Sequence, residues 1–292
     1  MHNKHSIKEM FFEHLTRFSA ILVLFFLSAI FIVLIIKAYP AIHHFGFSFI
    51  TEQKWAPNFE LFGGLPAIYG SFISTLIAML FAVPVAIGIA IFLSEISPKS
   101  LKAPMGVSIE LLAAIPSVVY GMWGLFYLAP FMRDIFGGNG LGLFTAGLIL
   151  AIMILPFISA ITRDALNTTP KILKESAYAL GATQWDVIKD IMTPYAKAGI
   201  VGSIILALGR AFGETMAVTF VMGNTHQIPN SIFDPATSIP STLANEFSEV
   251  DSELYLSSLY FLALILFIIS FIIIAFAKFY FLKNKRSRKI KK

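Results

Sequence analysis

The sequence predicts an all-α polytopic membrane protein with six transmembrane helices. Of its 292 residues, 57% are hydrophobic and only 13% are charged, and its mean hydropathy is +0.78. Soluble domains carry about 25% charged residues, so this composition lies far outside their range. A transmembrane β-barrel is excluded, because its strands would read as alternating segments of about ten residues. A helix needs about 20 mostly apolar residues to cross the bilayer core, and six segments meet this requirement: 18–38, 69–94, 107–130, 142–162, 199–222 and 256–280.

The lysine and arginine residues predict how these helices are oriented, because positive charges favour the cytoplasmic ends of membrane spans. With a cytoplasmic N-terminus, 18 of the 22 lysine and arginine residues fall on the inside. Only Lys37, Lys54 and Arg133 then lie outside. We therefore expect a multi-pass protein with both termini in the cytoplasm. The net charge of +5 reflects this asymmetry, so we expect no nucleic-acid partner, and the basic tail 283–292 suits contact with anionic membrane lipid.

The chain begins with a short polar segment, residues 1–17, which we expect to be a cytoplasmic tail. Its three histidines have a spacing that fits no metal-binding motif. The first apolar segment, 18–38, lacks a small-residue cleavage site before Lys37, so we expect a retained transmembrane helix, not a signal peptide. An external loop follows at 39–68 and is long for a helix connection. It either covers the outer mouth of a pathway, contacts a partner or is a plain surface loop.

The third span, 107–130, departs from a regular helix at two points. Glu110 lies near its cytoplasmic end, where the side chain either reaches the membrane interface, which we favour, or enters a pathway. Pro116 and Ser117 interrupt the helix at membrane depth. Irregular backbone is tolerated there when it is buried in protein or lines a cavity. The interruption therefore indicates a cavity, the interpretation that we favour, or an ordinary kink.

A patterned polar segment lies within the predicted cytoplasmic loop 165–198, between the fourth and fifth spans. Gly181 tolerates the left-handed conformation that ends a first short helix. Thr183 and Asp186 form a capping box that starts a second helix. Pro194 is expected to end that helix, because proline disfavours helix at the residue before it.

Two helices of about ten residues are too short to be stable alone in water, so we expect them to dock on something. The second helix has an apolar face opposite polar residues, which is typical of a helix that packs by one side. This face indicates that the loop fits a socket on a partner. It consists of Trp185, Ile188, Ile191 and Met192.

The fifth span, 199–222, contains two charged residues, Arg210 and Glu214. An arginine in the middle of a span is costly unless it faces water, an anion or a partner, so it is a functional candidate. In a continuous helix the two residues share one face, because they are four positions apart. The Gly209–Gly213 spacing permits another helix to pack closely on a neighbouring face. We expect this helix to line a pathway, and a self-neutralising ion pair is the alternative.

The planar guanidinium of Arg210 suits bidentate binding of tetrahedral oxyanions such as phosphate. Our hypothesis is that Glu214 holds Arg210 while the pathway is empty and releases it to a passing anion. The sequence contains no P-loop, HExxH or GxSxG motif and no cysteine. We therefore expect no catalytic residues, no metal site and no cofactor bound by this chain, so that energy must come from another subunit.

The external loop 223–255 carries five carboxylates and no lysine or arginine. We favour a solvated loop, with a charged docking surface as the alternative. The final span, from Leu256, is apolar all round and suits a lipid-facing position. The five carboxylates are Asp234, Glu246, Glu249, Asp251 and Glu253.

The cytoplasmic loop resembles the signature of ABC importer permeases, E-A-A-x3-G-x9-I-x-L-P. Serine replaces alanine at Ser176 and threonine replaces leucine at Thr193, and neither change breaks the spacing. In that family the loop inserts into a groove on the ATPase subunit. The resemblance therefore implies that this loop couples the chain to an ATPase through Glu175, Ser176, Ala177, Gly181, Trp185, Ile191 and Pro194.

Residues 63–224 resemble, almost continuously, the PstC-type permease family of the bacterial phosphate-specific importer. The segments that carry the resemblance include IELLAAIPSVVYGMWGLF, GLILAIMILPFISAITRDAL and LGRAFGETMAVTFVMGN. The resemblance implies a type I ABC importer permease fold in the bacterial cytoplasmic (inner) membrane, with a five-helix core over 69–282. It also implies that Arg210 and Glu214 act in phosphate passage.

The same resemblance implies the partners of this chain. These are a PstA-type permease, a PstB-type ATPase dimer that uses ATP and Mg, and a PstS-type phosphate-binding protein. The predicted function is the permease subunit of an ATP-driven phosphate importer, which forms half of the translocation pathway and works by alternating access. Two alternatives stay open, a permease for another oxyanion such as sulfate or molybdate and a membrane sensor or scaffold without transport. A membrane enzyme is disfavoured, because no catalytic residues converge.

Overall fold

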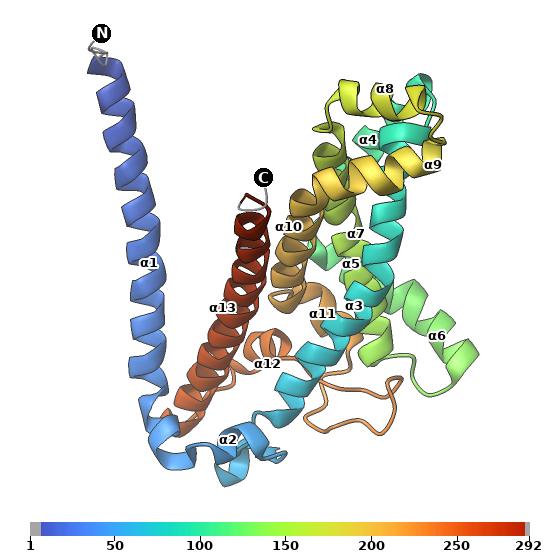
Figure 1. The fold of residues 1–292 in the computed structure, drawn as a ribbon. Coiled ribbons are helices and arrows are strands. Elements are labelled where there is room, and N and C mark those ends of the chain that lie inside the picture. Colours follow the sequence, from blue (N-terminus) through green and yellow to red (C-terminus); the bar gives the residue numbers. More distant parts are fainter. Residues whose placement is uncertain (1–6, 290–292) are drawn as a thin grey trace.

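Long helices run between the two ends of the molecule, with shorter helices at both ends (Figure 1). The computed structural model describes residues 7–289. The long helices are α1 (Ile7–Phe45), α3 (Leu65–Ile91), α7 (Leu143–Asn167), α10 (Thr193–Phe212) and α13 (Glu253–Lys289). The shorter ones are α2 (Ser48–Thr51), α4 (Lys99–Ala113), α5 (Ser117–Trp123), α6 (Ala129–Phe136), α8 (Lys171–Ala179), α9 (Gln184–Asp186), α11 (Met216–Val221) and α12 (Ile239–Glu246). π-Helical turns occur at η2 (Phe92–Ile96), η3 (Gly124–Leu128) and η4 (Val187–Met192), a 3-10 turn at η1 (Pro57–Phe59), and a two-stranded hairpin at β1 (Trp55–Ala56) and β2 (Leu61–Phe62).

Five of these helical segments are long and apolar enough to cross a membrane. A sixth crossing is reached if α4 and the run from α5 to α6, which meet at 89°, count as one broken span. The predicted all-α fold with six apolar segments is thus confirmed, with a sharp break in the third. The break falls at Pro116–Ser117, as predicted, and the Tyr120 hydroxyl donates across it to the carbonyl of Leu112, 2.8 Å away.

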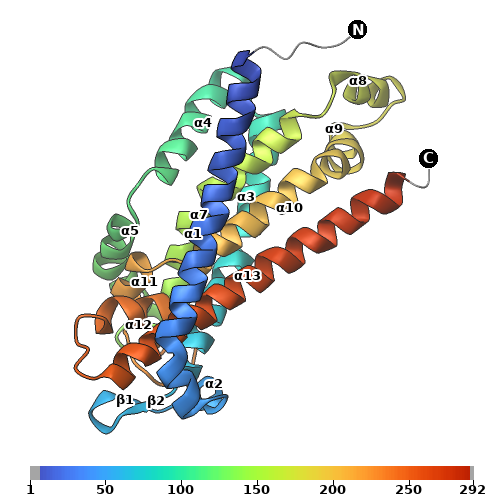
Figure 2. The ribbon, with the colours of Figure 1, turned by 90° about the vertical axis from the view of Figure 1, so that its left-hand side faces the viewer.

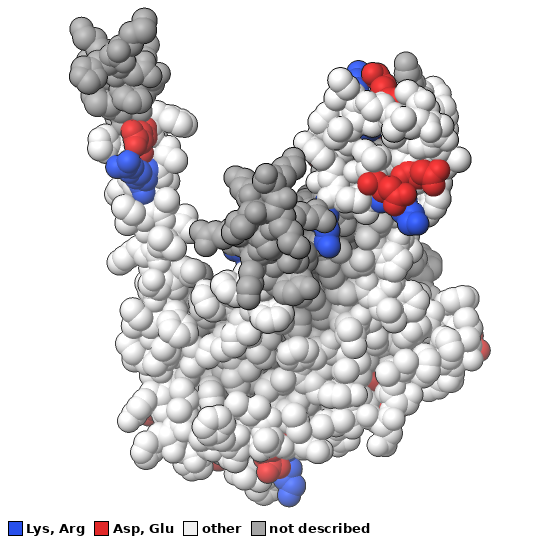
Figure 3. All heavy atoms as spheres, viewed as in Figure 1, with Lys and Arg blue, Asp and Glu red and all other residues white. Residues whose placement is uncertain are grey.

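The two ends of the molecule differ in composition from the middle. Both ribbon views place α8 and α9 at the same end of the molecule as the start of α1, though well apart from it, and α2 with the β1–β2 hairpin at the opposite end (Figures 1 and 2). We call these the α8 end and the hairpin end. On the face shown in Figure 3, charged side chains gather at the two ends and leave a broad, largely uncharged band between them. This band is what a bilayer requires of a protein surface.

The central core forms where α3, α10 and α11 pack around α7. Ala78, Ala82 and Ala86 recur every four residues along α3, and all three are fully buried. An added Cβ at Gly147 of α7 would come within 2.5 Å of Ile77. Small side chains let membrane helices approach closely, and this is why α3 and α7 form the tightest pair.

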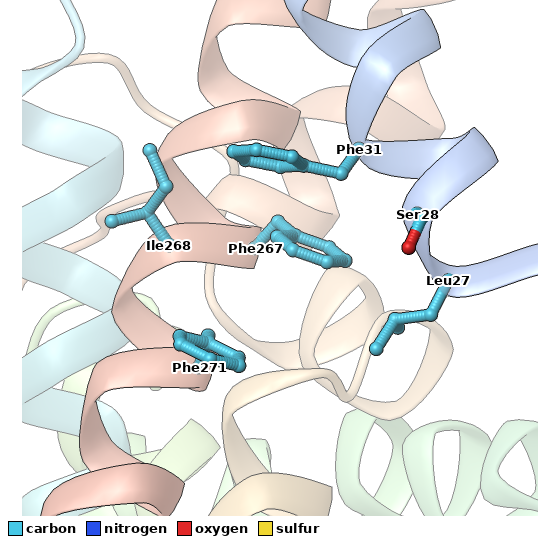
Figure 4. Close-up of a pocket in the computed structure, with 6 residues that line it drawn as sticks. All are labelled: Leu27, Ser28, Phe31, Phe267, Ile268 and Phe271. Carbon is cyan, nitrogen blue, oxygen red and sulfur yellow. The ribbon is translucent and has the colours of Figure 1, made fainter. Parts of the chain in front are cut away.

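α1 stands apart from this core and leans on α13. Phe31 of α1 stacks on Phe267 of α13, with ring centroids 5.4 Å apart. Figure 4 shows the shallow apolar pocket beside this contact, which is lined by side chains from these two helices only. By contrast, the first half of α13 is buried, including Leu259 and Leu262. The expectation that the final span faces lipid all round is therefore wrong for this half, because hydropathy does not distinguish an apolar helix in a core from one in lipid.

The first helix also extends beyond its predicted span. α1 includes positions that we assigned to the N-terminal tail and to the start of the 39–68 loop, because a helix does not have to end where the bilayer ends. The remainder of that loop contains α2 and the hairpin. Residues 1–6 of the predicted tail, and residues 290–292 of the predicted basic tail, lie outside the described residues.

Candidate translocation and coupling sites

The fifth predicted span is two helices with a break between them. α10 ends at Phe212 with Gly213 as its C-cap, and α11 begins at Met216. Glu214 lies in the break, where its Oε1 accepts a 3.3 Å hydrogen bond from the backbone N–H of Ala217. The prediction that Arg210 and Glu214 share the face of one continuous helix is therefore wrong. Glycine is tolerated at a helix end, and a carboxylate that accepts from the first backbone N–H groups favours a new helix start.

Arg210 lies in the last turn of α10 and is exposed. Its Cζ is 6.0 Å from the ring centroid of Phe157 on α7, a cation–π distance. Within the part of the chain that the structure describes, no carboxylate oxygen lies within 4.0 Å of its guanidinium. The ion pair with Glu214 is thus not formed here, either as a self-neutralising pair or as the hold on Arg210 that we expected of Glu214 while the pathway is empty. The helix macrodipole favours a cation at this end of α10, and the guanidinium keeps its hydrogen-bonding capacity for another group.

One and two turns before Arg210, the same side of α10 packs into the core. Ser203 and Ala207 are fully buried, and the Ser203 hydroxyl is hydrogen-bonded to that of Thr162 on α7 at 2.9 Å. Gly202 has no neighbour within 4 Å of an added Cβ, and at Gly209 the nearest atom is a side-chain carbon of Ile274 at 3.4 Å. The predicted close packing through the glycines is therefore wrong, since the serine and alanine face makes that contact.

The two interrupted segments lie against each other. At Gly121 of α5, an added Cβ would come within 3.0 Å of the Ala217 Cα on α11 and 2.8 Å of the Phe220 ring. The α4–α5 break and the α10–α11 break thus occur in helices that touch, with Arg210 two residues before the second break. Irregular backbone at membrane depth is stable where it is buried in protein or lines a cavity. Discontinuous helices of this kind form substrate sites in transporters.

At the α8 end, the local structure of the polar segment agrees with the sequence in two respects. Gly181 adopts the left-handed region at φ +86° between α8 and α9. The capping box is complete, because the Thr183 N–H donates to Asp186 at 2.9 Å and the Asp186 N–H donates to the Thr183 hydroxyl at 3.3 Å.

Pro194 does not end the second short helix, contrary to the prediction. α9, η4 and α10 form one continuous helical segment, Gln184–Phe212. The N–H and the hydroxyl of Thr193 both donate to the carbonyl of Ile188, in a π-type turn. A π-turn is wider than an α-turn, and Pro194, at the start of the next helix, needs no N–H partner there. The loop that we predicted to couple to an ATPase therefore runs directly into the helix that carries Arg210.

The predicted apolar face of this segment divides between two surfaces. Ile188 and Met192 are buried against their own chain, together with Leu166 of α7 and Ala90 of α3. Trp185 faces outward and is 63% exposed. The prediction of one socket-facing stripe is wrong, because two turns of that stripe are needed to hold the segment on the transmembrane helices.

Other large apolar side chains of the 171–186 segment are exposed as well. Leu180 is 90% exposed, and Ile172 is also exposed. No residue of α8 is buried, and Glu175 and Ser176 are exposed whereas Ala177 is half-buried. Of the remaining predicted coupling residues, Ile191 is half-buried and Pro194 is exposed. Exposed apolar clusters of this kind mark interaction sites.

Two ion pairs at the α8 end were missed by the sequence analysis. Arg163 of α7 donates to Glu110 of α4 at 3.0 Å, so Glu110 pairs with a neighbouring helix. Lys174 of α8 pairs with Glu95 in η2. Partners this far apart in the chain leave no trace in residue spacing. Among residues 7–289, no group of three or more His, Cys, Asp or Glu side chains is placed to hold a metal ion.

The hairpin end is organised around Glu246, at the end of α12. This carboxylate is only 8% exposed. It accepts hydrogen bonds from the Trp55 indole at 2.6 Å and the Tyr255 hydroxyl at 2.8 Å, and it also pairs with His226. The expectation of a solvated 223–255 loop is wrong for Glu246, which joins the two external loops to α13.

Discontinuous helices are a feature of transporters, and comparisons with known proteins point to the same class. Residues 82–288 match the family model of the binding-protein-dependent transport system inner membrane component. The chain belongs to this family. Membership implies an ATPase and a binding protein as partners in general, and places the chain among the inner-membrane components of such systems.

Relatives within the family are permeases of phosphate transport systems. The chain is 49% identical to the phosphate transport system permease protein PstC of Mesorhizobium japonicum, over 94% of this chain and 90% of that one. It is 45% identical to the protein of that name from Pasteurella multocida, over 98% and 96% of the two chains. These matches confirm the predicted resemblance to PstC-type permeases.

Solved structures with the same fold are also permeases. An inward-facing MetNI methionine ABC transporter aligns with a TM-score of 0.60 at 17% identity, over 77% of this chain and 96% of that one. A bacterial ABC transporter that imports the polysaccharide alginate aligns with a TM-score of 0.57 at 18% identity, over 97% and 100% of the two chains. These alignments confirm the predicted type I ABC importer permease fold.

Proposed function

We propose that this chain is the transmembrane permease subunit of an ATP-driven inorganic phosphate importer, and that it forms half of the pathway by alternating access. The observation that carries the proposal is Arg210, an exposed cation at a helix break in the apolar part of the molecule, without a carboxylate partner among the described residues. The names of the PstC relatives supply the anion.

The chemistry of Arg210 suits phosphate passage. Its planar fork can donate two parallel hydrogen bonds to two phosphate oxygens. The attraction between Arg210 and a phosphate ion is stronger where water is scarce. A transported ion must also be released from the pathway, so this attraction has to be weakened at a later step. In this proposal Glu214 assists release. We infer that it gives up its bond from the Ala217 N–H when the break moves, and then competes with phosphate for Arg210.

The partners follow from the same proposal. A PstB-type ATPase dimer, which uses ATP and Mg, would bind the exposed apolar surface around Trp185 at the cytoplasmic side. A PstA-type permease would supply the other half of the pathway, and a PstS-type phosphate-binding protein would dock at the hairpin end. The α8 end and both termini would then be cytoplasmic, in the inner membrane of a bacterium, with membrane lipid around the bundle. This chain itself would bind no cofactor and catalyse no reaction.

The test is anion uptake by vesicles that contain the assembled transporter. Arg210→Gln should lower phosphate uptake about ten- to a hundredfold, because it removes a charge-assisted hydrogen-bonding partner contributing about 1.5–3 kcal/mol. Arg133→Gln, which changes an exposed arginine paired with its neighbour Asp134, is the matched control and should leave uptake unchanged. Unaltered uptake in Arg210→Gln would refute the role of Arg210. Transport of sulfate or molybdate in place of phosphate would show that the chain is an anion permease with a different substrate. The absence of any anion transport would favour a membrane sensor or scaffold.

A further inference from the structure

Glu95 connects both short cytoplasmic segments to the end of α3. Its carboxylate pairs with the ammonium group of Lys174 on α8. Its backbone carbonyl accepts a 3.2 Å hydrogen bond from the side-chain amide of Gln184, the first residue of α9. One residue in η2 therefore holds the segments on both sides of Gly181.

The Glu95–Lys174 pair is more shielded than the exposed ion pairs of the chain. The two side chains are 16% and 17% exposed. Those of the Arg17–Glu13 pair on α1 are 69% and 58% exposed. Exposed pairs contribute little, whereas removal of one partner from a shielded pair leaves a poorly solvated charge. The structure thus favours a persistent contact between α8 and η2.

The other end of α3 is attached to the hairpin end with equal closeness. The Ser71 hydroxyl accepts a 2.8 Å hydrogen bond from the backbone N–H of Ile239, the first residue of α12. At Gly70 an added Cβ would lie 1.8 Å from the carbonyl oxygen of Thr237, so the two backbones are in direct contact. At 1.5 Å per residue, the helix from Ser71 to Glu95 spans about 35 Å.

Chain connectivity already joins the cytoplasmic loop to α7 and α10. The η4 turn also packs on Ala90 of α3 through Ile188 and Met192, but the Glu95–Lys174 pair is what joins α8 itself to the end of α3. With the pair formed, α3 also follows α8, and its far end moves the 237–239 segment before α12. Rigid helices with fixed contacts at both ends are the physical means by which distant sites are coupled.

We propose that Glu95 is a positioning residue, and that its pair with Lys174 makes α3 a second mechanical connection between the cytoplasmic loop and the hairpin end. This inference rests on the proposed function, because it assumes that an ATPase moves the loop. The inference adds a coupling residue that lies outside the ABC importer signature. It also adds a mechanical route through α3 that does not pass through Arg210.

The first arm of the test measures phosphate transported per ATP hydrolysed by the assembled transporter in vesicles. Glu95→Gln and Lys174→Met should each lower this ratio about two- to thirtyfold, the range of measured coupling changes, while ATP hydrolysis continues. The reversed pair, Glu95→Lys with Lys174→Glu, should recover most of the ratio. The matched control is Lys171→Met, an exposed lysine on the same helix, which should keep the wild-type ratio. Unchanged ratios in both single variants, or an equal fall in the control, would overturn the inference.

The second arm does not depend on the substrate. The chain contains no cysteine, so spin labels can be placed at Phe47→Cys, between α1 and α2, and Phe247→Cys, directly after α12, both exposed positions. ATP should change the distance between these labels by about 1–2 Å or more, and Lys174→Met should abolish the change. If the wild-type transporter fails to take up phosphate but ATP still changes the distance between the labels, the result counts against the proposed substrate and not against the role of α3. A distance that responds to ATP equally with and without Lys174 would overturn the role of α3.

Discussion

The α8 end and the hairpin end satisfy their side chains in opposite ways. At the hairpin end, one buried carboxylate accepts from Trp55 and Tyr255 and pairs with His226, so that three segments distant in sequence are joined within the chain. At the α8 end, no residue of α8 is buried, and Trp185 and Leu180 are 63% and 90% exposed. Glu246 thus holds the hairpin end together within the chain, even though Phe47 and Phe59 are exposed there, whereas α8 has no buried side chain of its own, as the proposed binding of an ATPase to this end requires.

The largest stability effect is expected at the hairpin end. Glu246→Ala leaves the Trp55 and Tyr255 donors and His226 without their acceptor, and it should lower the free energy of unfolding by about 3–5 kcal/mol. Denaturant unfolding of the purified chain in detergent measures this loss. Glu249→Ala, an exposed carboxylate three residues further on, should change it by less than about 0.5 kcal/mol. Equal effects of the two changes would show that the hairpin end is not organised by Glu246.

The next effect separates the two surfaces of the α8–α9 loop, one packed on the transmembrane helices and one exposed. Met192→Ala removes a fully buried side chain and should cost about 2–5 kcal/mol of stability in the isolated chain. Trp185→Ala should leave that stability unchanged but weaken binding of the ATPase by about 2 kcal/mol or more, as expected for an aromatic residue at the centre of an interface. Unfolding of the chain and titration with the purified ATPase measure the two quantities. A Trp185→Ala chain that unfolds more easily yet binds normally would assign Trp185 to the fold.

The smallest effect concerns the capping box. Thr183→Ala removes the acceptor for the Asp186 N–H and should lower the local stability of the second short helix by about 1 kcal/mol. Amide hydrogen exchange in α9 should rise, while exchange in α3 and α7 stays at its original rate. Thr168→Ala, whose hydroxyl donates to a carbonyl of α7 outside this helix, serves as the control. If exchange in α9 does not change, the helix is held by Ile188 and Met192 alone.

Local signals in the sequence predicted a large part of this structure. The apolar segments, the interruption at Pro116 and the capping box at Thr183 are each encoded within a few consecutive residues, and all three are present. The end of α10 was also encoded locally, by Gly213 and the carboxylate that follows it. It was misread because glycine in a membrane helix serves equally well for close packing.

Other features depend on contacts that no local pattern contains. Lys174 and Glu95 are 79 positions apart, and Trp55 and Glu246 are 191 apart. Residue spacing brings neither pair together. The continuation of helix through Pro194 depends on a π-turn, which places Thr193 under the carbonyl of Ile188, and propensity rules for α-helices do not anticipate that geometry.

The central claim is that the cytoplasmic loop transmits the work of an ATPase to a phosphate pathway. Its most direct test is Gly181→Pro, since a proline cannot adopt the φ of +86° that this turn requires. Phosphate uptake and ATP hydrolysis are measured side by side in vesicles, with Gly138→Pro, another glycine at positive φ in an open turn, as the control. We expect hydrolysis to continue and uptake to fall by about tenfold or more in Gly181→Pro, with the protein still inserted in the membrane. Normal coupled uptake by that variant would contradict the claim.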